Sequence, residues 1–149
     1  MNYINVIGST KKKRDIVESA VIFCISELMP RMRTLEIEVN LKNIPEEEGA
    51  AGWCYEGESN RDFYIDVDKR LDVEEMVETV CHEMVHVWQG ATRKMKDLPF
   101  GRKMYMGNIY DDTLAYEDEP WEIEAYDMQG GLLEKFKEEY VIRDRDWET

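Results

Sequence analysis

The chain has 149 residues and a formal net charge of −14, which fits one acidic domain with enough residues to bury a hydrophobic core. So acidic a balance argues against general binding to nucleic acid or to an anionic membrane, since both need a basic face. No apolar run approaches a membrane span, the N-terminus lacks the apolar core of a signal peptide, and the three cysteines form no C-x-x-C pair. These features predict a single domain over residues 1–149, with its core at about 15–140, in a reducing, cytoplasmic setting.

The first half of the chain predicts one helix and a small set of strands. Residues 1–8 are mildly apolar and form a short lead-in strand or an arm, and the basic cluster Lys11 to Arg14 is interpreted as a solvated helix start. From Asp15 to Met29 apolar residues recur every three or four positions, which predicts an amphipathic helix that Pro30 ends. Three strands are expected after it, over residues 35–41, 51–56 and 61–68.

A second helix is predicted from Val73 to Trp88, where apolar residues again recur at helical spacing. Asp72 and Glu75 form a plausible capping pair for this helix, and Gly90 a plausible stop. Residues 98–118 follow no period and are rich in tyrosine and methionine. Because long loops in compact domains tend to line functional sites, we expect this stretch to contribute to one.

The last predicted helix begins at Asp118 or Glu119, with Pro120 in its first turn. Its middle contains Gly130-Gly131, which we expect to mark a break or a close contact between helices. The highly charged tail after Tyr140 is expected to fray.

The second helix carries the pattern His-Glu-x-x-His at residues 82–86. Residues four apart lie on the same face of a helix, so His82 and His86 can point two imidazoles at one metal ion, with the carboxylate of Glu83 beside them. This is the metal-and-base arrangement of a zinc peptidase. The alternative is a pair of ordinary polar residues on a buried helix. Because these are the only two histidines in the chain, an accidental match is uncommon, at about one in a few hundred.

A third ligand has to come from a carboxylate or a thiolate, because no third histidine exists. Catalytic zinc usually has three protein ligands and leaves a fourth position for water. The segment from Glu119 to Asp127 on the last helix offers the natural carboxylate candidates. Cys81 adjoins His82, but neighbouring helix positions face about 100° apart, so we expect its thiol to pack in the core.

The H-E-x-x-H motif, followed some tens of residues later by a helix reading E-x-E-A, resembles the gluzincin metallopeptidases. The resemblance covers about residues 61–131 and is closest to the compact single-domain kind (minigluzincins, and the ImmA/IrrE and SprT-like peptidase domains). It implies an α+β, zincin-like domain with an N-terminal helix, a small twisted sheet of about three to four strands, the H-E-x-x-H helix and a C-terminal helix that supplies a glutamate.

The resemblance also implies a ligand set for Zn²⁺, namely His82, His86 and Glu122, since the first glutamate of E-x-x-A binds zinc in that family. Ala125 matches the small residue of the motif. Where the related E-x-x-A-D pattern has an aspartate that orients a histidine, this chain has Tyr126. That departure leaves the orienting group open and keeps Glu124 as a less favoured ligand.

The expected function is therefore a zinc metalloendopeptidase acting on a peptide or protein substrate, with Glu83 as general base for the attacking water. An oxyanion donor is expected from the tyrosines of the long loop, where the sequence does not rank Tyr105, Tyr110 and Tyr116. A peptide substrate is expected to add itself as a strand along an exposed sheet edge. Two alternatives stay open: a catalytically silent zinc-binding domain that acts as a protein-interaction module, and a DNA-associated protease of the SprT kind, against which the acidic balance weighs.

Overall fold

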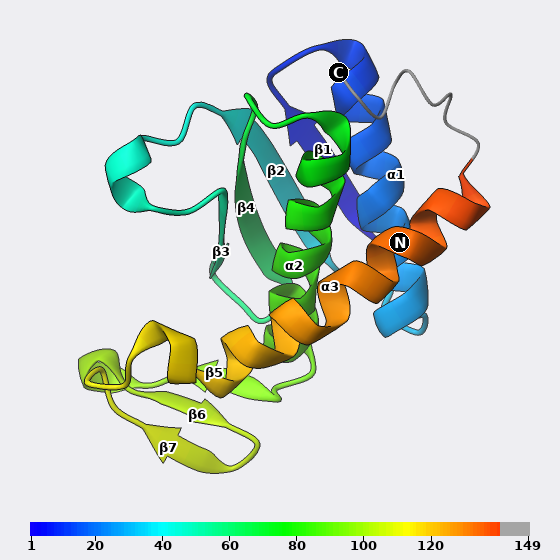
Figure 1. Cartoon of the computed structure of the whole chain (residues 1–149). Helices are drawn as coiled ribbons and strands as arrows, with labels where there is room; N and C mark the ends of the chain where they lie inside the picture. Colours follow the sequence, from blue (N-terminus) through cyan, green and yellow to red (C-terminus); the bar gives the residue numbers. More distant parts are fainter. Residues whose placement is uncertain (141–149) are drawn as a thin grey trace.

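Two small sheets and three α-helices make up residues 1–140, the part of the chain that this computed structural model describes (Figure 1). The α+β class expected from the sequence is confirmed. The α-helices are α1 (Lys11–Leu28), α2 (Val73–Ala91) and α3 (Pro120–Glu139). The main sheet contains β1 (Tyr3–Ile7), β2 (Glu36–Lys42), β3 (Gly52–Glu56) and β4 (Asp62–Asp68). The second sheet contains β5 (Met95–Asp97), β6 (Lys103–Tyr105) and β7 (Asn108–Tyr110), and the 3-10 turns are η1 (Glu46–Glu48), η2 (Pro99–Gly101) and η3 (Tyr116–Asp118).

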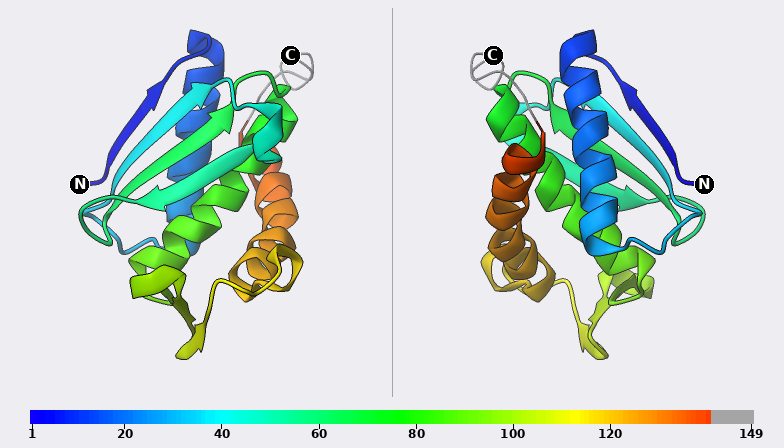
Figure 2. Two further views of the ribbon diagram at one scale, coloured as in Figure 1. Left: turned by 90° about the vertical axis from the view of Figure 1, so that its left-hand side faces the viewer. Right: turned by 90° about the vertical axis from the view of Figure 1, so that its right-hand side faces the viewer.

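The main sheet has the strand order β1-β2-β4-β3, in which β3 is antiparallel to β4 and the other neighbours are parallel. Its apolar residues alternate with polar ones, and the register of β2 and β4 places apolar residues side by side. The aligned pairs are Ile37 with Phe63, Val39 with Ile65 and Leu41 with Val67. Within residues 1–140, α1 and α2 lie against one face of this sheet and no helix covers the other (Figure 2). The buried strand residues therefore pack under the two helices, and β3 forms one free edge of the sheet.

Helix α2 is the central element, since it packs against α1, α3 and the strands β3 and β4. Asp72 caps its N-terminus by accepting a hydrogen bond from the backbone N–H of Glu75 at 2.8 Å, so the expected capping role of Asp72 is confirmed. Thirteen of its nineteen residues are buried. The helix is thus almost surrounded, and polar side chains within it need partners of their own.

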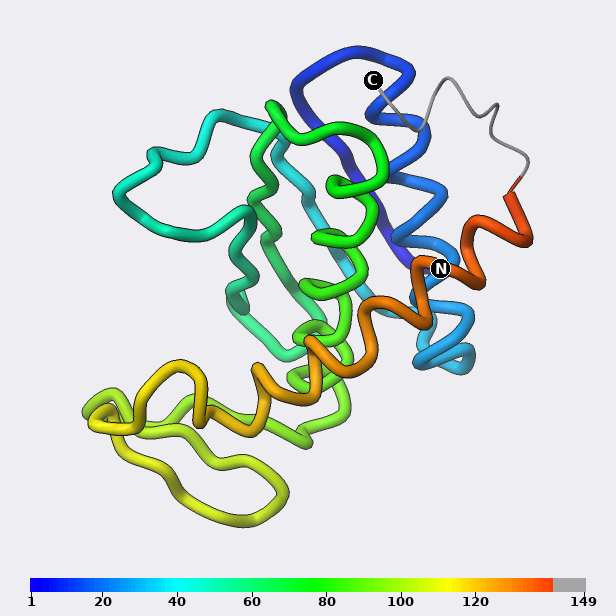
Figure 3. Tube along the Cα trace, in the orientation of Figure 1, coloured from blue at the N-terminus to red at the C-terminus, as the bar shows by residue number. Residues whose placement is uncertain are grey.

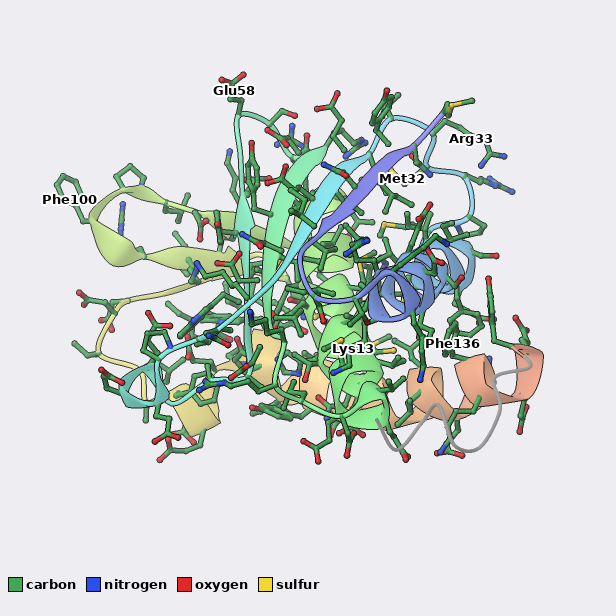
Figure 4. All side chains as sticks on the ribbon, turned by 90° about the horizontal axis from the view of Figure 1, so that it is seen from above. Lys13, Met32, Arg33, Glu58, Phe100 and Phe136 are labelled. Carbon is green, nitrogen blue, oxygen red and sulfur yellow. The ribbon has the colours of Figure 1, made fainter. Side chains whose placement is uncertain are left out.

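Helix α3 crosses α2 (Figure 3) and is held at its far end by Phe136. The Phe136 ring is fully buried and meets the ring of Phe23 from α1 edge to face, with centroids 5.6 Å apart. Figure 4 shows Phe136 reaching from α3 toward α1. Leu132 and Leu133 are buried beside it. This apolar contact fixes the helix that carries the predicted glutamate ligand.

Two expectations for the second half of the chain are wrong. The stretch 98–118 is not irregular throughout, because β6 and β7 pair within it and β5 joins them; strands of three residues are too short to show a period in the sequence. Helix α3 runs unbroken through Gly130 and Gly131, and a Cβ at either position would meet no atom within 4 Å. These glycines mark neither a break nor a close helix contact. The expected fraying after Tyr140 concerns residues outside the described range.

None of the helices formed by residues 1–140 combines the length and the apolar character that crossing a membrane requires.

Candidate metal centre

Helices α2 and α3 bring together the three residues that the sequence singles out as metal ligands. His82 and His86 project from α2, and Glu122 projects from the first turn of α3. His82 Nε2 lies 2.9 Å from Glu122 Oε1, and His86 Nε2 lies 3.1 Å from Glu122 Oε2. One ligand atom from each residue lies within 4.8 Å of the other two. This His-His-Glu group could hold a metal ion.

Two glutamines orient the imidazoles from behind. The Oε1 atom of Gln129 lies 2.8 Å from His82 Nδ1, and the Oε1 atom of Gln89 lies 2.8 Å from His86 Nδ1. The amide of Gln89 has only one sensible orientation, because its Nε2 group donates to the backbone carbonyl of Trp121 at 3.0 Å and to the side chain of Glu124 at 2.9 Å. Its oxygen must therefore face His86.

The orientation of Gln89 fixes the position of one proton of His86. Since Gln89 Oε1 can only accept, His86 Nδ1 carries a proton and donates it. A neutral His86 then presents a lone pair on Nε2, which faces the carboxylate of Glu122. His82 has the same arrangement around Gln129 and Glu122. Both Nε2 atoms lie within hydrogen-bond distance of Glu122, and each offers a lone pair to a metal once its ring is neutral. Two nitrogens and one carboxylate oxygen are a donor set that zinc accepts.

Glu124, the less favoured ligand, lies outside this group. Its carboxylate accepts hydrogen bonds from Gln89 and from the ammonium group of Lys94. Burial raises the pKa of Glu124, but the bonds from Lys94 and Gln89 outweigh it, so the net pKa is lowered. Glu124 therefore holds Gln89 in place, and through it the ring of His86.

Glu83 lies at the floor of a cavity of about 420 Å³ beside the histidines. It is 5% exposed, and it makes no hydrogen bond with any residue that the structure describes. Burial raises the pKa of Glu83 to about 7, against the opposing charges of His86 and His82. A carboxylate with a pKa near neutrality, open to a cavity at a metal-binding group, has the properties of a general base. The cavity is lined by Glu48, Gly49, Ala50, Ala51, Gly52, Trp53, Cys54, Glu78, Thr79, His82, Glu83, His86, Tyr116, Glu122, Tyr126 and Gln129.

Glu83→Gln is expected to stabilise the metal-free protein at alkaline pH. A pKa of about 7 in the folded state, against 4.5 as the ordinary value, means that the folded protein binds this proton more tightly than the unfolded chain. The resulting penalty is absent below pH 4.5, grows between pH 4.5 and 7, and is complete above pH 7. Such a rise corresponds to at most about 3 kcal/mol. Urea unfolding with a chelator present should show Glu83→Gln more stable by about 1–3 kcal/mol at pH 8 and equal to wild type at pH 4.5; a constant difference across this range would contradict the assignment.

Of the three tyrosines that the sequence leaves unranked, only Tyr116 lines the cavity. Its hydroxyl donates to Glu122 Oε1 at 3.1 Å and lies 3.1 Å from the hydroxyl of Tyr126. Burial is the main reason why the pKa of Tyr116 lies well above its ordinary value. By contrast, the Tyr105 side chain is buried and bonds Glu124, with burial as the first cause that raises its pKa to about 12. The Tyr110 ring packs on Trp121 with centroids 5.8 Å apart.

Comparisons of the chain with protein-family models, with curated proteins and with solved structures found no match. The chemistry of the site is therefore argued from its side chains.

Sequence reasoning missed Gln89 and Gln129, and it noted Tyr126 only as a departure from the related motif. Gln89 follows His86 by three residues, and Gln129 follows Glu122 by seven, so each shares a helix face with a ligand. This spacing was the available signal. The Tyr126 ring lies over His82, with centroids 4.5 Å apart, where the gluzincin pattern places an orienting aspartate. Gln129 holds the His82 ring instead.

Gly52 allows β3 to approach the site closely, and Gly52→Ala is expected to destabilise the protein. A Cβ at this position would lie 2.7 Å from Thr79 Cγ2, 2.9 Å from the carbonyl oxygen of Asp66 and 3.2 Å from Glu83 Oε2. The carbonyl belongs to the neighbouring strand and cannot move alone, so overpacking should cost about 1–3 kcal/mol in urea unfolding. Gly130→Ala is the matched control. Its methyl group meets open space in mid-helix and should stabilise by about 0.5–1 kcal/mol, so equal signs for the two variants would contradict this packing.

Proposed function

We propose that this protein is a zinc-dependent endopeptidase in which His82, His86 and Glu122 bind Zn²⁺ and Glu83 is the general base. The observation that carries the proposal is the convergence of two imidazole nitrogens and a carboxylate beside a second carboxylate, Glu83, in a cavity. A structural zinc site has four protein ligands, whereas catalytic sites keep a position for water. Three ligand atoms that open on a cavity favour the catalytic kind.

The roles of the residues follow from this chemistry. A zinc ion held by His82, His86 and Glu122 would supply Lewis acidity, which polarises a peptide carbonyl and lowers the pKa of water toward neutrality. Glu83 accepts the proton of the attacking water and returns it to the leaving amine, for which a pKa near 7 is well matched. Gln89 and Gln129 keep both Nε2 atoms aimed at the ion position.

The free edge of β3 offers a place for the substrate backbone. Among the strands of residues 1–140, β3 pairs with β4 alone, and Gly52, Trp53 and Cys54 line the cavity from this strand. An extended peptide can add to such an edge through main-chain hydrogen bonds. It would then pass directly over Glu83, whose Oε2 atom lies under Gly52.

The test is a paired measurement of zinc content and peptide cleavage on protein purified without chelator. We expect one zinc per chain and cleavage of a mixed peptide library. Glu83→Gln should keep the zinc and lower kcat by about 10²–10⁴-fold, the usual contribution of a general base. Full activity in Glu83→Gln would rule out the proposed role. A zinc-loaded wild type that cleaves nothing would favour the interaction-module alternative instead.

Tyr116→Phe is expected to lower kcat by about 10–10³-fold while KM changes little. The hydroxyl of Tyr116 lies beside Glu122 in the cavity, where it can donate to the oxygen that becomes negative in the transition state. Tyr110→Phe is the control, because Tyr110 does not line the cavity. Steady-state kinetics on one peptide would check both variants. An equal loss in the two would mean that Tyr116 acts only through packing.

A further inference from the structure

The charged side chains that line the cavity, apart from the histidines, are all carboxylates: Glu48, Glu78, Glu83 and Glu122. No lysine or arginine of the described chain is among the lining residues. Glu122 belongs to the His-His-Glu group, and Glu83 lies beside that group. Glu48 and Glu78 have no part in the proposed reaction, and their presence calls for a separate explanation.

The pair Glu83 and Glu122 differs from the pair Glu48 and Glu78 in whether a metal ion would offset its negative charge. A divalent cation would offset the two negative charges of Glu83 and Glu122, which leaves the floor of the cavity close to neutral. Among residues 1–140, no cationic side chain offsets Glu48 or Glu78 in this way. Within residues 1–140, neither of them forms an ion pair, and the one hydrogen bond to either comes from the neutral indole N–H of Trp53 to Glu48 at 3.2 Å.

These two carboxylates come from different walls of the cavity. Glu78 precedes His82 by four residues on α2, so it lies on the same helix face one turn before the ligand. Glu48 belongs to η1, in the loop that leads into β3 (Figure 1). A peptide along the β3 edge would therefore pass between Glu78 on α2 and Glu48 on the loop.

We propose that the cleft selects peptides that carry a lysine or arginine side chain next to the scissile bond, and that Glu48 and Glu78 recognise this side chain. The inference rests on the proposed function, since it names the substrate class of the same site. A basic side chain would supply the cation that both carboxylates lack, whereas an acidic one would meet like charge on both walls. The net charge of −14 also steers basic peptides toward the protein.

The first experiment compares cleavage of three fluorogenic peptide libraries by the zinc-loaded protein. The libraries differ only in carrying Lys, Ala or Glu at the two positions on either side of the scissile bond. We expect kcat/KM to be about tenfold or more higher for the Lys library than for the Glu library at low salt. The preference for the Lys library should fall at least about threefold in the double variant Glu48→Gln/Glu78→Gln. It should also fall in the wild-type protein at about 0.5 M salt, because salt screens the charges.

A matched control removes a charge from the same helix outside the cavity. Glu75 is exposed on the first turn of α2 and does not line the cavity, so Glu75→Gln should keep the wild-type preference. Equal cleavage of the three libraries by wild type would overturn the inference. So would a preference that the double variant retains in full.

A binding measurement separates this inference from the peptidase proposal. Fluorescence anisotropy of labelled Lys and Glu peptides with zinc-loaded Glu83→Gln protein needs no turnover. If the Lys peptide bound preferentially but wild type did not cleave it, the peptidase proposal would be rejected and the proposed charge selection would be supported. Cleavage without a Lys preference would support the peptidase and overturn the charge selection. If the protein showed no cleavage and no preferential binding, both proposals would be overturned.

Discussion

Glu122→Gln is expected to lower the affinity for zinc by more than about a hundredfold. The carboxylate is the only anionic member of the His-His-Glu group, and an amide in its place loses the charge that zinc requires. Loss of an outer partner of a ligand already costs 10–100-fold, and loss of the ligand itself must cost more. Titration against a chromophoric chelator at neutral pH measures the effect directly.

Glu124→Gln is the matched control for this variant, two residues along the same helix. The Glu124 side chain accepts hydrogen bonds from Gln89 and Lys94, and it acts on His86 only through Gln89. We expect its zinc affinity to fall by less than about tenfold. If Glu124→Gln lost zinc while Glu122→Gln kept it, the ligand assignment between these two glutamates would have to be exchanged.

Phe136→Ala is expected to lower the free energy of unfolding by about 3–5 kcal/mol, the usual cost of truncating a fully buried phenylalanine. The ring projects from α3, is completely buried, and meets Phe23 of α1. Urea unfolding of the metal-free protein measures the loss. Ile123→Ala, on the same helix but 46% exposed, should stay within about 0.5 kcal/mol of wild type.

Zinc should recover part of the stability that Phe136→Ala loses. Because α3 carries Glu122, an ion that binds only the folded protein stabilises the docked helix by mass action. At a hundred times the dissociation constant this amounts to about 2.7 kcal/mol. A loss below about 1 kcal/mol for Phe136→Ala would mean that α3 does not depend on this contact. No effect of zinc on the variant would mean that the ion does not bind its folded form.

The helices and the pairing of His82 with His86 could be predicted from the sequence because each leaves a short-range pattern. The four-residue spacing of His82 and His86 places both on one helix face whatever surrounds the helix. Glu122 was predicted from the resemblance to the E-x-x-A motif and not from spacing. The sequence of neither helix determines how closely the two helices pack.

The parts that could not be predicted depend on packing between elements. Gln129 is recognisable as a partner of His82 only once the crossing of α2 and α3 is known. Tyr116 stands out among the tyrosines only because η3 leads directly into α3 beside Glu122. The second sheet was missed for a different reason, because its three-residue strands are held by tertiary pairing and leave no alternation to detect.

The two glutamines behind the histidines differ in one respect from the aspartate that the related motif would supply. A carboxamide has no proton to gain or lose in water, whereas a carboxylate becomes neutral in mildly acidic solution. The glutamine oxygens that accept from the imidazoles therefore do not themselves change protonation state across that transition. Acid should release an ion from this centre by protonating the ligands themselves, since neither glutamine takes up a proton.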